Sequence, residues 1–572
     1  MMVCHCRCFS MASTSAISAV SSTANVLVSS VPIAPLGLNL RGVGAKVRVS
    51  DRSPDDPRRS IQPGEGWASM NFRGISIALV ISIAGCGVPA SHPLAPTPTT
   101  VLPSSSGDPG RAVLAGKGYR QDKQGLVVVH LRGTEAELEE QYRFLLADEI
   151  AAFDARVRRH RGMQSYLGGC SNIAVFGPAS ADGSLWHGRN FDFSGHGLLD
   201  RYRVVYIVEP DAKIPYVTLS WTGPIPWNYR GVHTAMNSSG LTLGYMISQA
   251  PGESNRGTPA LWGLFREVIE RATTIDEAVA ILEASPRGAA ANLLLADGKT
   301  PDAVVVEMTS KALVVRPAKQ GVVYSTNHFV SPELFYAANR DPDSIARFER
   351  LGALAEDGYG AFDLAHTVSA LRDRYDVHLQ QETPEGDVIG NPLNMLSVVF
   401  HPADLTFWVA EGSAPSSYRQ FVSFNLQAEL DGTQWEAEFS PVRPDATLDA
   451  GQWEEIEAYQ SGRRAYDQGD YASAVEYFSR AVELNPDSPR YGYRLAGALM
   501  NLKRYDEAIA ALQGALTGDS ESVYRAFIYH RLGLIYEGMG DREQMREAFE
   551  QVLAIDVGDE AIESYARQAL SR

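Results

Sequence analysis

The chain has 572 residues, of which 45% are hydrophobic, and it carries a net charge of −17. That length allows several domains, and the hydrophobic fraction is sufficient for buried cores. A nucleic-acid-binding domain usually presents a basic face or stripe, and the acidic composition with no such stripe argues against a nucleic-acid partner.

The beginning of the chain contains a pattern typical of an export signal. Residues 1–69 are rich in Ser, Ala, Pro and Arg and contain no long periodic element. They are followed by Arg73, an apolar run at 75–84 and Gly-Cys at 85–86. A positive start, a short apolar run and small residues before a cysteine form the layout of a secretory signal. The run is too short to span a bilayer as a mature helix.

Residues 83–86 resemble a bacterial lipobox, in which the cysteine is lipidated and becomes the first residue of the mature protein. The resemblance implies a lipid anchor at Cys86 and an exported lipoprotein of the bacterial cell envelope, attached to the membrane by this lipid alone. It also implies a signal over residues 70–86 that starts at Met70, with residues 1–69 disordered or mis-assigned. A buried core segment is the alternative.

The next section, residues 87–118, has several prolines among Ser, Thr and Gly. Such a composition cannot bury a core and predicts a semi-extended linker.

From residue 119 to residue 443 the pattern becomes globular. Residues 126–131 predict a buried strand, and residues 134–160 predict a helix with Thr134 as its N-cap. Further along, blocks of short β-rich runs alternate with pairs of helices, the helices being expected at 260–272, 275–284, 344–354 and 361–375. Strands in blocks and helices in pairs predict an α+β fold in which helices cover stacked sheets.

The last section, residues 452–572, repeats itself. Gly462 is followed by Ala496 after 34 residues and by Gly533 after a further 37, with aromatic residues at similar offsets. This pattern resembles tetratricopeptide repeats, which are helix pairs with small residues where the helices touch. The resemblance covers about the last 110 residues. It implies an all-α domain that either binds a protein partner or serves as a packing platform for the preceding domain.

The chemistry of the chain centres on Cys170, which is the only cysteine in the last 486 residues. It lies in Gly-Gly-Cys-Ser-Asn at 168–172. A lone thiol cannot form a disulfide within its own domain, and no metal-ligand spacing surrounds it. It is therefore either a small buried hydrophobe or a nucleophile.

A nucleophilic thiol needs a base, because at pH 7 it is mostly protonated. Cleavage of the Gly169–Cys170 bond would provide one on the same residue. The new α-amine would have a pKa of roughly 7.7–8.0, which lies below that of a free thiol. The glycines before Cys170 would allow close approach at the carbonyl to be attacked.

Further motifs follow Cys170 in order: Arg-Asn-Phe-Asp at 189–192, Met-Asn-Ser-Ser-Gly-Leu at 236–241 and Ser-Thr-Asn-His-Phe at 325–329. This ordered set resembles the N-terminal-nucleophile hydrolases. More narrowly it resembles the group of penicillin acyl-CoA acyltransferase (isopenicillin N acyltransferase), the C45 peptidases, with choloylglycine hydrolase as a more distant relative. The resemblance covers about residues 120–425.

The resemblance implies an αββα sandwich, no metal and no cofactor. It implies a self-processing cysteine amidohydrolase or acyltransferase that acts on a linear N-acyl amide through an acyl-thioester. In that scheme, cleavage after Gly169 makes Cys170 the N-terminal nucleophile, and residues 86–169 stay bound to the rest of the protein.

The resemblance also assigns roles to later residues. Asp192 matches the residue that holds the α-amine, and Arg189 begins the same motif. Asn327 matches the oxyanion-hole amide, and Asn237 matches the asparagine before the Gly-Leu strand. Arg347 matches a later family arginine, although neighbouring Arg350 competes for that match.

Two other functions remain open from the sequence. One is a Cys-His protease in which Cys170 works with His328 or His401 and no cleavage is needed. The other is a lipid-anchored tetratricopeptide scaffold whose hydrolase-like domain is inert.

Overall fold

The computed structural model describes residues 112–114, 117–157, 169–193, 202–224, 227–248, 250, 260–337, 342–378, 380–383, 387–435, 437, 441–518, 523–555 and 560–571. These residues all belong to one unit of the chain, Lys46–Arg572. The predicted lipid signal with Cys86 and most of the Pro-rich section lie outside the described residues, so those predictions remain untested. In the part of the chain that the structure describes, no helix is long and apolar enough to cross a membrane.

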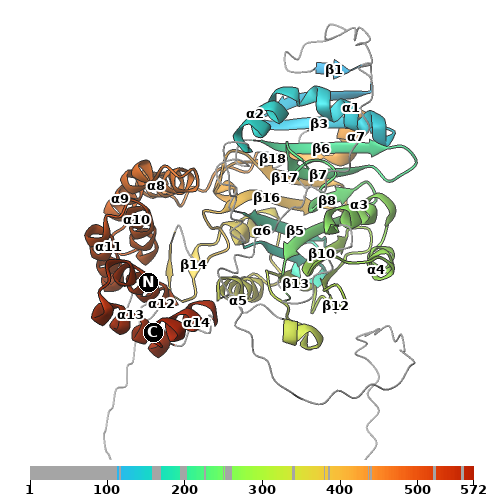
Figure 1. Cartoon of the computed structure of the whole chain (residues 1–572). Coiled ribbons are helices and arrows are strands. Elements are labelled where there is room, and N and C mark those ends of the chain that lie inside the picture. The colour runs from blue at the N-terminus through green and yellow to red at the C-terminus, as the bar shows by residue number, and fades with distance from the viewer. Residues whose placement is uncertain are drawn as a thin grey trace, which may run out of the picture. The chain divides into compact units, whose positions relative to one another are not determined.

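The larger sheet has ten strands among the described residues, in the order β1-β2-β3-β6-β7-β8-β9-β10-β11-β12 (Figure 1). Their bounds are β1 Ala112–Leu114, β2 Gly118–Lys123, β3 Leu126–Gly133, β6 Arg203–Pro210, β7 Tyr216–Trp221, β8 Thr234–Asn237, β9 Leu241–Ile247, β10 Ala291–Asp297, β11 Asp302–Met308 and β12 Leu313–Pro317. Strands β3 and β6 run parallel. The chain leaves this sheet after β3 and returns to it at β6, and between them it supplies two strands of the second sheet.

The smaller sheet has six strands among the described residues, in the order β13-β4-β5-β16-β17-β18. Their bounds are β4 Ser171–Val175, β5 Trp186–Asp192, β13 Val322–Ser325, β16 Asn394–His401, β17 Thr406–Ala410 and β18 Phe421–Asn425. Strands β4 and β5 are antiparallel with Asn172 opposite Arg189, and Asp192 lies opposite Asn394 of β16. This register brings the start of β4, the end of β5 and the start of β16 to one edge of the sheet.

Apolar side chains pack the two sheets face to face. The shared core includes Val205 and Leu219 from the larger sheet and Val398 and Phe407 from the smaller one. Alternate residues of each strand point inward, as sandwich packing requires. Cys170 belongs to this same core.

Helices cover the outer face of each sheet. Leu138, Phe265 and Leu282 come from the helices on the larger sheet, and Leu351 and Val368 come from those on the smaller one. These outer helices are α1 Glu135–Leu145, α2 Ala147–Val157, α3 Leu261–Arg271, α4 Ile275–Ala284, α5 Pro342–Asp357 and α6 Leu364–Arg372. The short helix α7 Leu426–Asp431 instead contributes Leu426 to the core between the two sheets. The predicted α+β fold, an αββα sandwich, is confirmed.

The helix expected at 134–160 is divided in two. Thr134 is its N-cap as predicted, and it forms a capping box with Glu137. Leu146, however, leaves the helical conformation, with φ −122° and ψ 25°. Its side chain is fully buried in the core of the larger sheet. Burial of this side chain therefore overrides a helical pattern that continues in the sequence.

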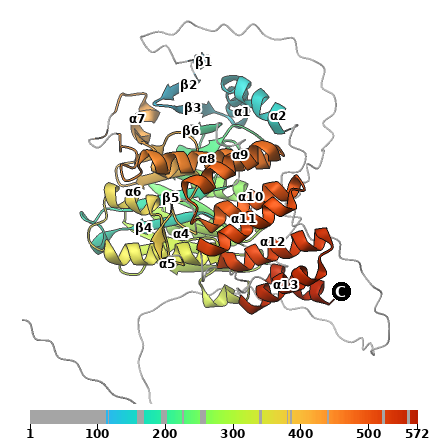
Figure 2. The ribbon, with the colours of Figure 1, turned by 90° about the vertical axis from the view of Figure 1, so that its left-hand side faces the viewer.

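The C-terminal helices follow one another as successive pairs (Figure 2). They are α8 Ala450–Asp467, α9 Tyr471–Leu484, α10 Pro489–Asn501, α11 Tyr505–Gly518, α12 Val523–Met539, α13 Arg542–Ile555 and α14 Glu560–Leu570. The repeated small residues lie where paired helices touch. A Cβ atom at Gly462 would lie 2.5 Å from the Phe478 ring, and one at Gly533 would lie 2.5 Å from the Phe549 ring. The same glycine–phenylalanine contact thus recurs in two helix pairs.

We predict that Gly462→Ala destabilises the repeats by about 1–3 kcal/mol, because the added methyl group forces the Phe478 ring out of a packed position. Gly514→Ala is the matched control: it also lies in a repeat helix, but its Cβ would meet no atom within 4 Å. We expect this control to stabilise the helix by about 0.5–1 kcal/mol. Urea unfolding followed by circular dichroism measures both changes, and equal effects would contradict the packing described.

Candidate active site

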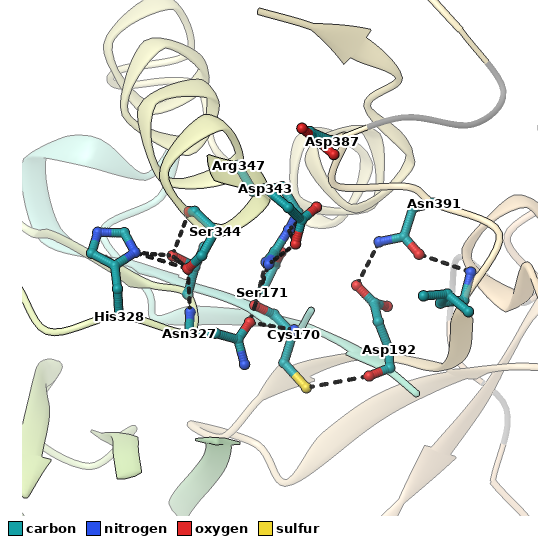
Figure 3. A network of polar contacts seen from close by, with 12 residues as sticks. Cys170, Ser171, Asp192, Asn327, His328, Asp343, Ser344, Arg347, Asp387 and Asn391 are labelled. Carbon is teal, nitrogen blue, oxygen red and sulfur yellow. Dashed lines mark hydrogen bonds and ion pairs between the residues drawn. The ribbon is translucent and has the colours of Figure 1, made fainter. Parts of the chain in front are cut away.

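Cys170 lies immediately before β4 and contacts two of the residues that the motifs singled out (Figure 3). Its backbone N–H donates to Oδ1 of Asn327 at 2.7 Å. Its Sγ lies 3.9 Å from the backbone oxygen of Asp192. The thiol is free and only 4% of the residue is exposed. The structure therefore brings Cys170, Asp192 and Asn327 together from three strands or strand ends.

Asn327 is held in place through its backbone and its side chain. Its backbone N–H donates to Oγ of Ser344 at 2.8 Å, and its Nδ2 donates to the backbone oxygen of Ile247 at 2.9 Å. Its Oδ1 accepts from Arg347 Nη2 at 3.1 Å as well as from Cys170. The side-chain amide nitrogen carries two hydrogens. One is used in the hydrogen bond to Ile247, so Nδ2 can donate one further hydrogen bond.

Arg347, on α5, fixes the backbone around Cys170. Its guanidinium is fully buried. It donates to the carbonyl oxygen of Cys170 at 2.6 Å and to Oγ of Ser171 at 3.2 Å, and it pairs with Asp343 at 2.7 Å. A Cβ atom at Gly169 would overlap Arg347 Nη2 and would lie 2.7 Å from Asp343 Oδ2. Glycine before the nucleophile is therefore explained by this ion pair.

The same geometry separates the two arginines that competed in the sequence. Arg350, one turn later on α5, pairs instead with Asp373 at 2.7 Å. Arg347 is thus the arginine that contacts Cys170.

Asp192 is buried and is held by two side-chain amides. Asn391 Nδ2 donates to its Oδ2 at 2.7 Å, and Asn394 Nδ2 donates to its Oδ1 at 2.9 Å. Burial raises the pKa of Asp192 to about 7, although Arg347 and both amides act to lower it. Sequence reasoning missed both asparagines. The only signal is their position in Asn-Pro-Leu-Asn at 391–394, directly before a predicted strand.

Arg189 projects from β5 into the core beside the thiol. Its Nε donates to Oγ1 of Thr234 at 2.7 Å. Within the described residues, its Nη1 and Nη2 have no hydrogen-bond partner although both are buried. Burial raises the pKa of the Cys170 thiol, and the charge of Arg189 offsets part of that rise. The buried thiol of Cys170 therefore ionises less readily than an exposed thiol does.

Asn237 is not part of this network. Its Nδ2 donates to the backbone oxygens of Ile269 and Ala272 at 3.0 and 2.8 Å. Its Oδ1 accepts from the N–H groups of Ser239 and Leu241 at 3.1 Å. These contacts hold a turn against the end of α3, and a catalytic role for Asn237 remains a prediction that they do not support.

The histidines also have partners other than the thiol. His328 Nδ1 lies 2.8 Å from Oγ of Ser344, and burial lowers its pKa to about 4. His401 Nδ1 lies 2.8 Å from Asp404. Neither ring has a contact with Cys170 among the described residues, so the Cys-His protease alternative gains no geometric support.

Comparison with known families accounts for both parts of the chain. Residues 179–415 match the family model of acyl-coenzyme A:6-aminopenicillanic acid acyl-transferase. Residues 459–523 and 528–556 match tetratricopeptide-repeat models. The chain thus matches an acyl-transferase family model over residues 179–415 and tetratricopeptide-repeat models nearer its C-terminus. Both resemblances found in the sequence are confirmed, and the first match begins after Cys170.

Individual relatives are more distant. An uncharacterized protein of Archaeoglobus fulgidus is 25% identical over 225 residues, which cover 34% of this chain and 36% of the relative. Small glutamine-rich tetratricopeptide repeat-containing protein 2 of Saccharomyces cerevisiae is 33% identical over 106 residues, which cover 18% of this chain and 30% of the relative. The chain therefore spans about a third of the length of these curated relatives.

Two solved structures resemble the first domain. The Caenorhabditis elegans ortholog of N-acylethanolamine-hydrolyzing acid amidase has 19% identity and a TM-score of 0.30, covering 41% of this chain and 93% of its own. A mutant of the conjugated bile acid hydrolase from Clostridium perfringens has 13% identity and a TM-score of 0.32, covering 47% of this chain and 97% of its own.

We predict that Arg347→Met destabilises the first domain by about 3–5 kcal/mol, because it leaves the Cys170 carbonyl and one side of Asp343 without the buried cation. The control is Arg504→Met, which breaks an exposed pair with Glu507 on the repeats and should change stability little. Thermal unfolding of both variants measures the effect. A small loss in Arg347→Met would mean that the guanidinium is not needed to hold the nucleophile's backbone.

Proposed function

We propose that the protein is a self-processing cysteine amidohydrolase or acyltransferase that acts on a linear N-acyl amide. The observation that carries the proposal is the placement of the Cys170 nitrogen 2.7 Å from Asn327 Oδ1. After cleavage this nitrogen becomes the α-amine, and the same contact would hold it beside its own thiol. The match of residues 179–415 to an acyl-transferase family supports this class of reaction.

In the processing step, Cys170 Sγ attacks the carbonyl carbon of Gly169. The new carbon–sulfur bond forms and the carbon–nitrogen bond breaks, and the Cys170 nitrogen takes up a proton as it leaves. Water then hydrolyses the thioester, which gives a Gly169 carboxylate and restores the thiol. The Arg347–Asp343 pair lies against Gly169 and would hold the peptide in place during this step.

In the catalytic cycle, the α-amine accepts the thiol proton while sulfur attacks the substrate carbonyl. Asn327 Nδ2 donates to the developing oxyanion, a contribution of about 3–4 kcal/mol per donor in related chemistry. The leaving amine takes the proton from the α-ammonium group, and an acyl-thioester remains. Water or an acceptor amine then attacks the thioester and regenerates Cys170.

Asp192 and Arg189 would stabilise the charged groups that form during this cycle. The Asp192 carboxylate stabilises the protonated α-amine, and Arg189 favours the thiolate. The terminal nitrogens of Arg189 have no partner among the described residues, so they could also bind an acceptor oxygen of the substrate.

The location and partners of the protein belong to the same proposal. A lipid on Cys86 would tether an exported protein to the bacterial cell envelope, with the Pro-rich section as a spacer. The repeats would bind a protein partner, pack against the enzyme, or do both.

Intact mass spectrometry of the purified protein beside Cys170→Ala tests the processing step. We expect the wild type to give two fragments divided between residues 169 and 170, and the variant to remain one chain. Labelling by iodoacetamide at Cys170 should accompany cleavage. An uncleaved wild type that still hydrolyses amides would refute self-processing, and an uncleaved, unreactive one would favour the inert scaffold.

We also predict that Gly169→Ala slows self-cleavage by at least tenfold, because the methyl group would displace Arg347 and Asp343 from the peptide to be cut. Gly263→Ala, on α3, is the control: its Cβ would meet no atom within 4 Å, and it should cleave at the wild-type rate. The fraction cleaved over time after cell-free synthesis gives both rates. Equal rates would show that the ion pair does not constrain the scissile peptide.

A further inference from the structure

The carboxylate of Asp192 is held by a short segment that has no helix or strand until its last residue. We call residues 387–394 the amide loop. Besides the two amides on Asp192, its Ile389 carbonyl accepts from Asn190 Nδ2 at 3.0 Å, so the loop contacts the end of β5 at two residues. Where the loop lies therefore decides whether the two amides reach the carboxylate.

Two side chains from the repeats hold the amide loop. Gln460, on α8, donates through Nε2 to the carbonyl oxygen of Pro392. Arg490, on α10, pairs with Asp387 at 2.5 Å and lies 4.0 Å from Asp376. Gln460 is 6% exposed and Asp387 is 9% exposed. Both contacts are thus largely shielded from water.

An apolar contact fixes α8 beside the same loop. Trp453 and Ile456 of α8 pack with Tyr418, whose ring is fully buried. The Tyr418 hydroxyl donates to the carbonyl oxygen of Gly390, in the middle of the amide loop. The loop is therefore held at both ends and in the middle by groups that belong to the repeats or pack against them.

We propose that Gln460 and Arg490 are positioning residues of the active site, which hold the amide loop so that Asn391 and Asn394 point their N–H groups at Asp192. The repeats would then complete the catalytic domain as well as follow it. This inference rests on the proposed catalytic role of Asp192. Loops are ordinarily more mobile than the strands they join. A side-chain amide on a loop therefore needs such anchoring to stay within hydrogen-bond distance of its acceptor.

The loop has a chemical effect because its amides favour the charged form of Asp192. The other charged groups that influence the carboxylate come from several elements. Arg347 on α5 favours its charge, and Asp343 on α5 opposes it. Cys170 before β4, Arg189 on β5 and Tyr418 also lie within its field. Burial is the largest cause of the raised pKa of Asp192. If the loop loosens so that the amides move away while the carboxylate stays buried, the amides no longer stabilise the charge and the pKa of Asp192 rises further.

The variants Gln460→Glu and Arg490→Met test the inference in the full chain. A glutamate in place of Gln460 keeps the size of the side chain but, as a carboxylate, cannot donate to the Pro392 carbonyl. Arg480→Met is the matched control, because Arg480 pairs with Glu454 and Glu483 within the repeats. Asn391→Ala removes one of the two amides directly. Its shift of the pH profile is the upper limit that we expect when one end of the loop is loosened.

The first measurement is hydrogen exchange by mass spectrometry, which needs no substrate. We expect faster exchange in peptides covering 387–394 for both test variants and no change in those covering β5. The control should match the wild type throughout. Wild-type exchange of the loop in folded Gln460→Glu and Arg490→Met would overturn the inference.

The second measurement is the pH dependence of kcat/KM with an N-acyl 7-amino-4-methylcoumarin. Because a higher pKa of Asp192 requires a higher pH for ionisation, the acid limb should move up by roughly one pH unit, a tenfold change in the ratio of carboxylate to acid. We expect kcat to fall and KM to stay near the wild-type value. Faster loop exchange with an unchanged pH profile, or a uniform loss at every pH, would refute positioning.

A wild-type enzyme that is cleaved at Cys170 but hydrolyses no acyl coumarin would count against the proposed function alone. Hydrogen exchange would still decide whether the repeats hold the amide loop.

Discussion

The backbone of Cys170 is fixed from both sides, and the rest of the site depends on this constraint. Arg347 holds its carbonyl oxygen and Asn327 holds its N–H group. A guanidinium suits this task because it stays charged and donates in a rigid plane. Arg347 also donates to Asn327, so the two side chains form one hydrogen-bonded unit that fixes the backbone of Cys170.

The two carboxylates of the site, Asp192 and Asp343, have different hydrogen-bond partners. Asp192 has neutral amides within hydrogen-bond distance, whereas Asp343 has the guanidinium of Arg347. Neutral amides stabilise the charge of a carboxylate less strongly than a cation in direct contact does. Burial raises the pKa of Asp192 to about 7, and the charge of Arg347 and the two amides offset only part of that rise. If the proposed cleavage places a positive α-amine beside it, that charge would favour the carboxylate form of Asp192.

The sequence predicted the parts of the site that lie in short motifs. Cys170, Asp192 and Asn327 are adjacent in space because each lies at or just beyond the end of a strand in the smaller sheet, and the ordered motifs that carry the family resemblance grouped them. Arg347 could not be separated from Arg350, because residues three apart on a helix lie nearly one turn apart and project from the same face. Asn237 looked equivalent to Asn327 as a motif asparagine, yet its hydrogen bonds hold a turn and the end of a helix.

The contacts that the sequence did not reveal are those between distant segments. Asn391 and Asn394 are 199 and 202 residues away from Asp192 in the chain, and neither occurs in a motif tied to catalysis. Leu146 similarly interrupts a helix because of a core that only the folded chain creates. Local patterns predict elements and short motifs, whereas partners of this kind depend on the register of strands far apart in the sequence.

Tetratricopeptide repeats usually contact mainly their neighbours, so their stability is close to a sum over units. Here α8 and α10 also contact the amide loop, through Gln460 and Arg490. If the loop sets the ionisation of Asp192, any ligand that shifts these helices changes the reactivity of Cys170. If that ligand also changes the affinity of the acyl site, linkage requires that occupation of the acyl site change the affinity of the repeats for the ligand by the same factor. The two interpretations of the repeats, as a binding surface and as a packing platform, are then aspects of one coupled structure.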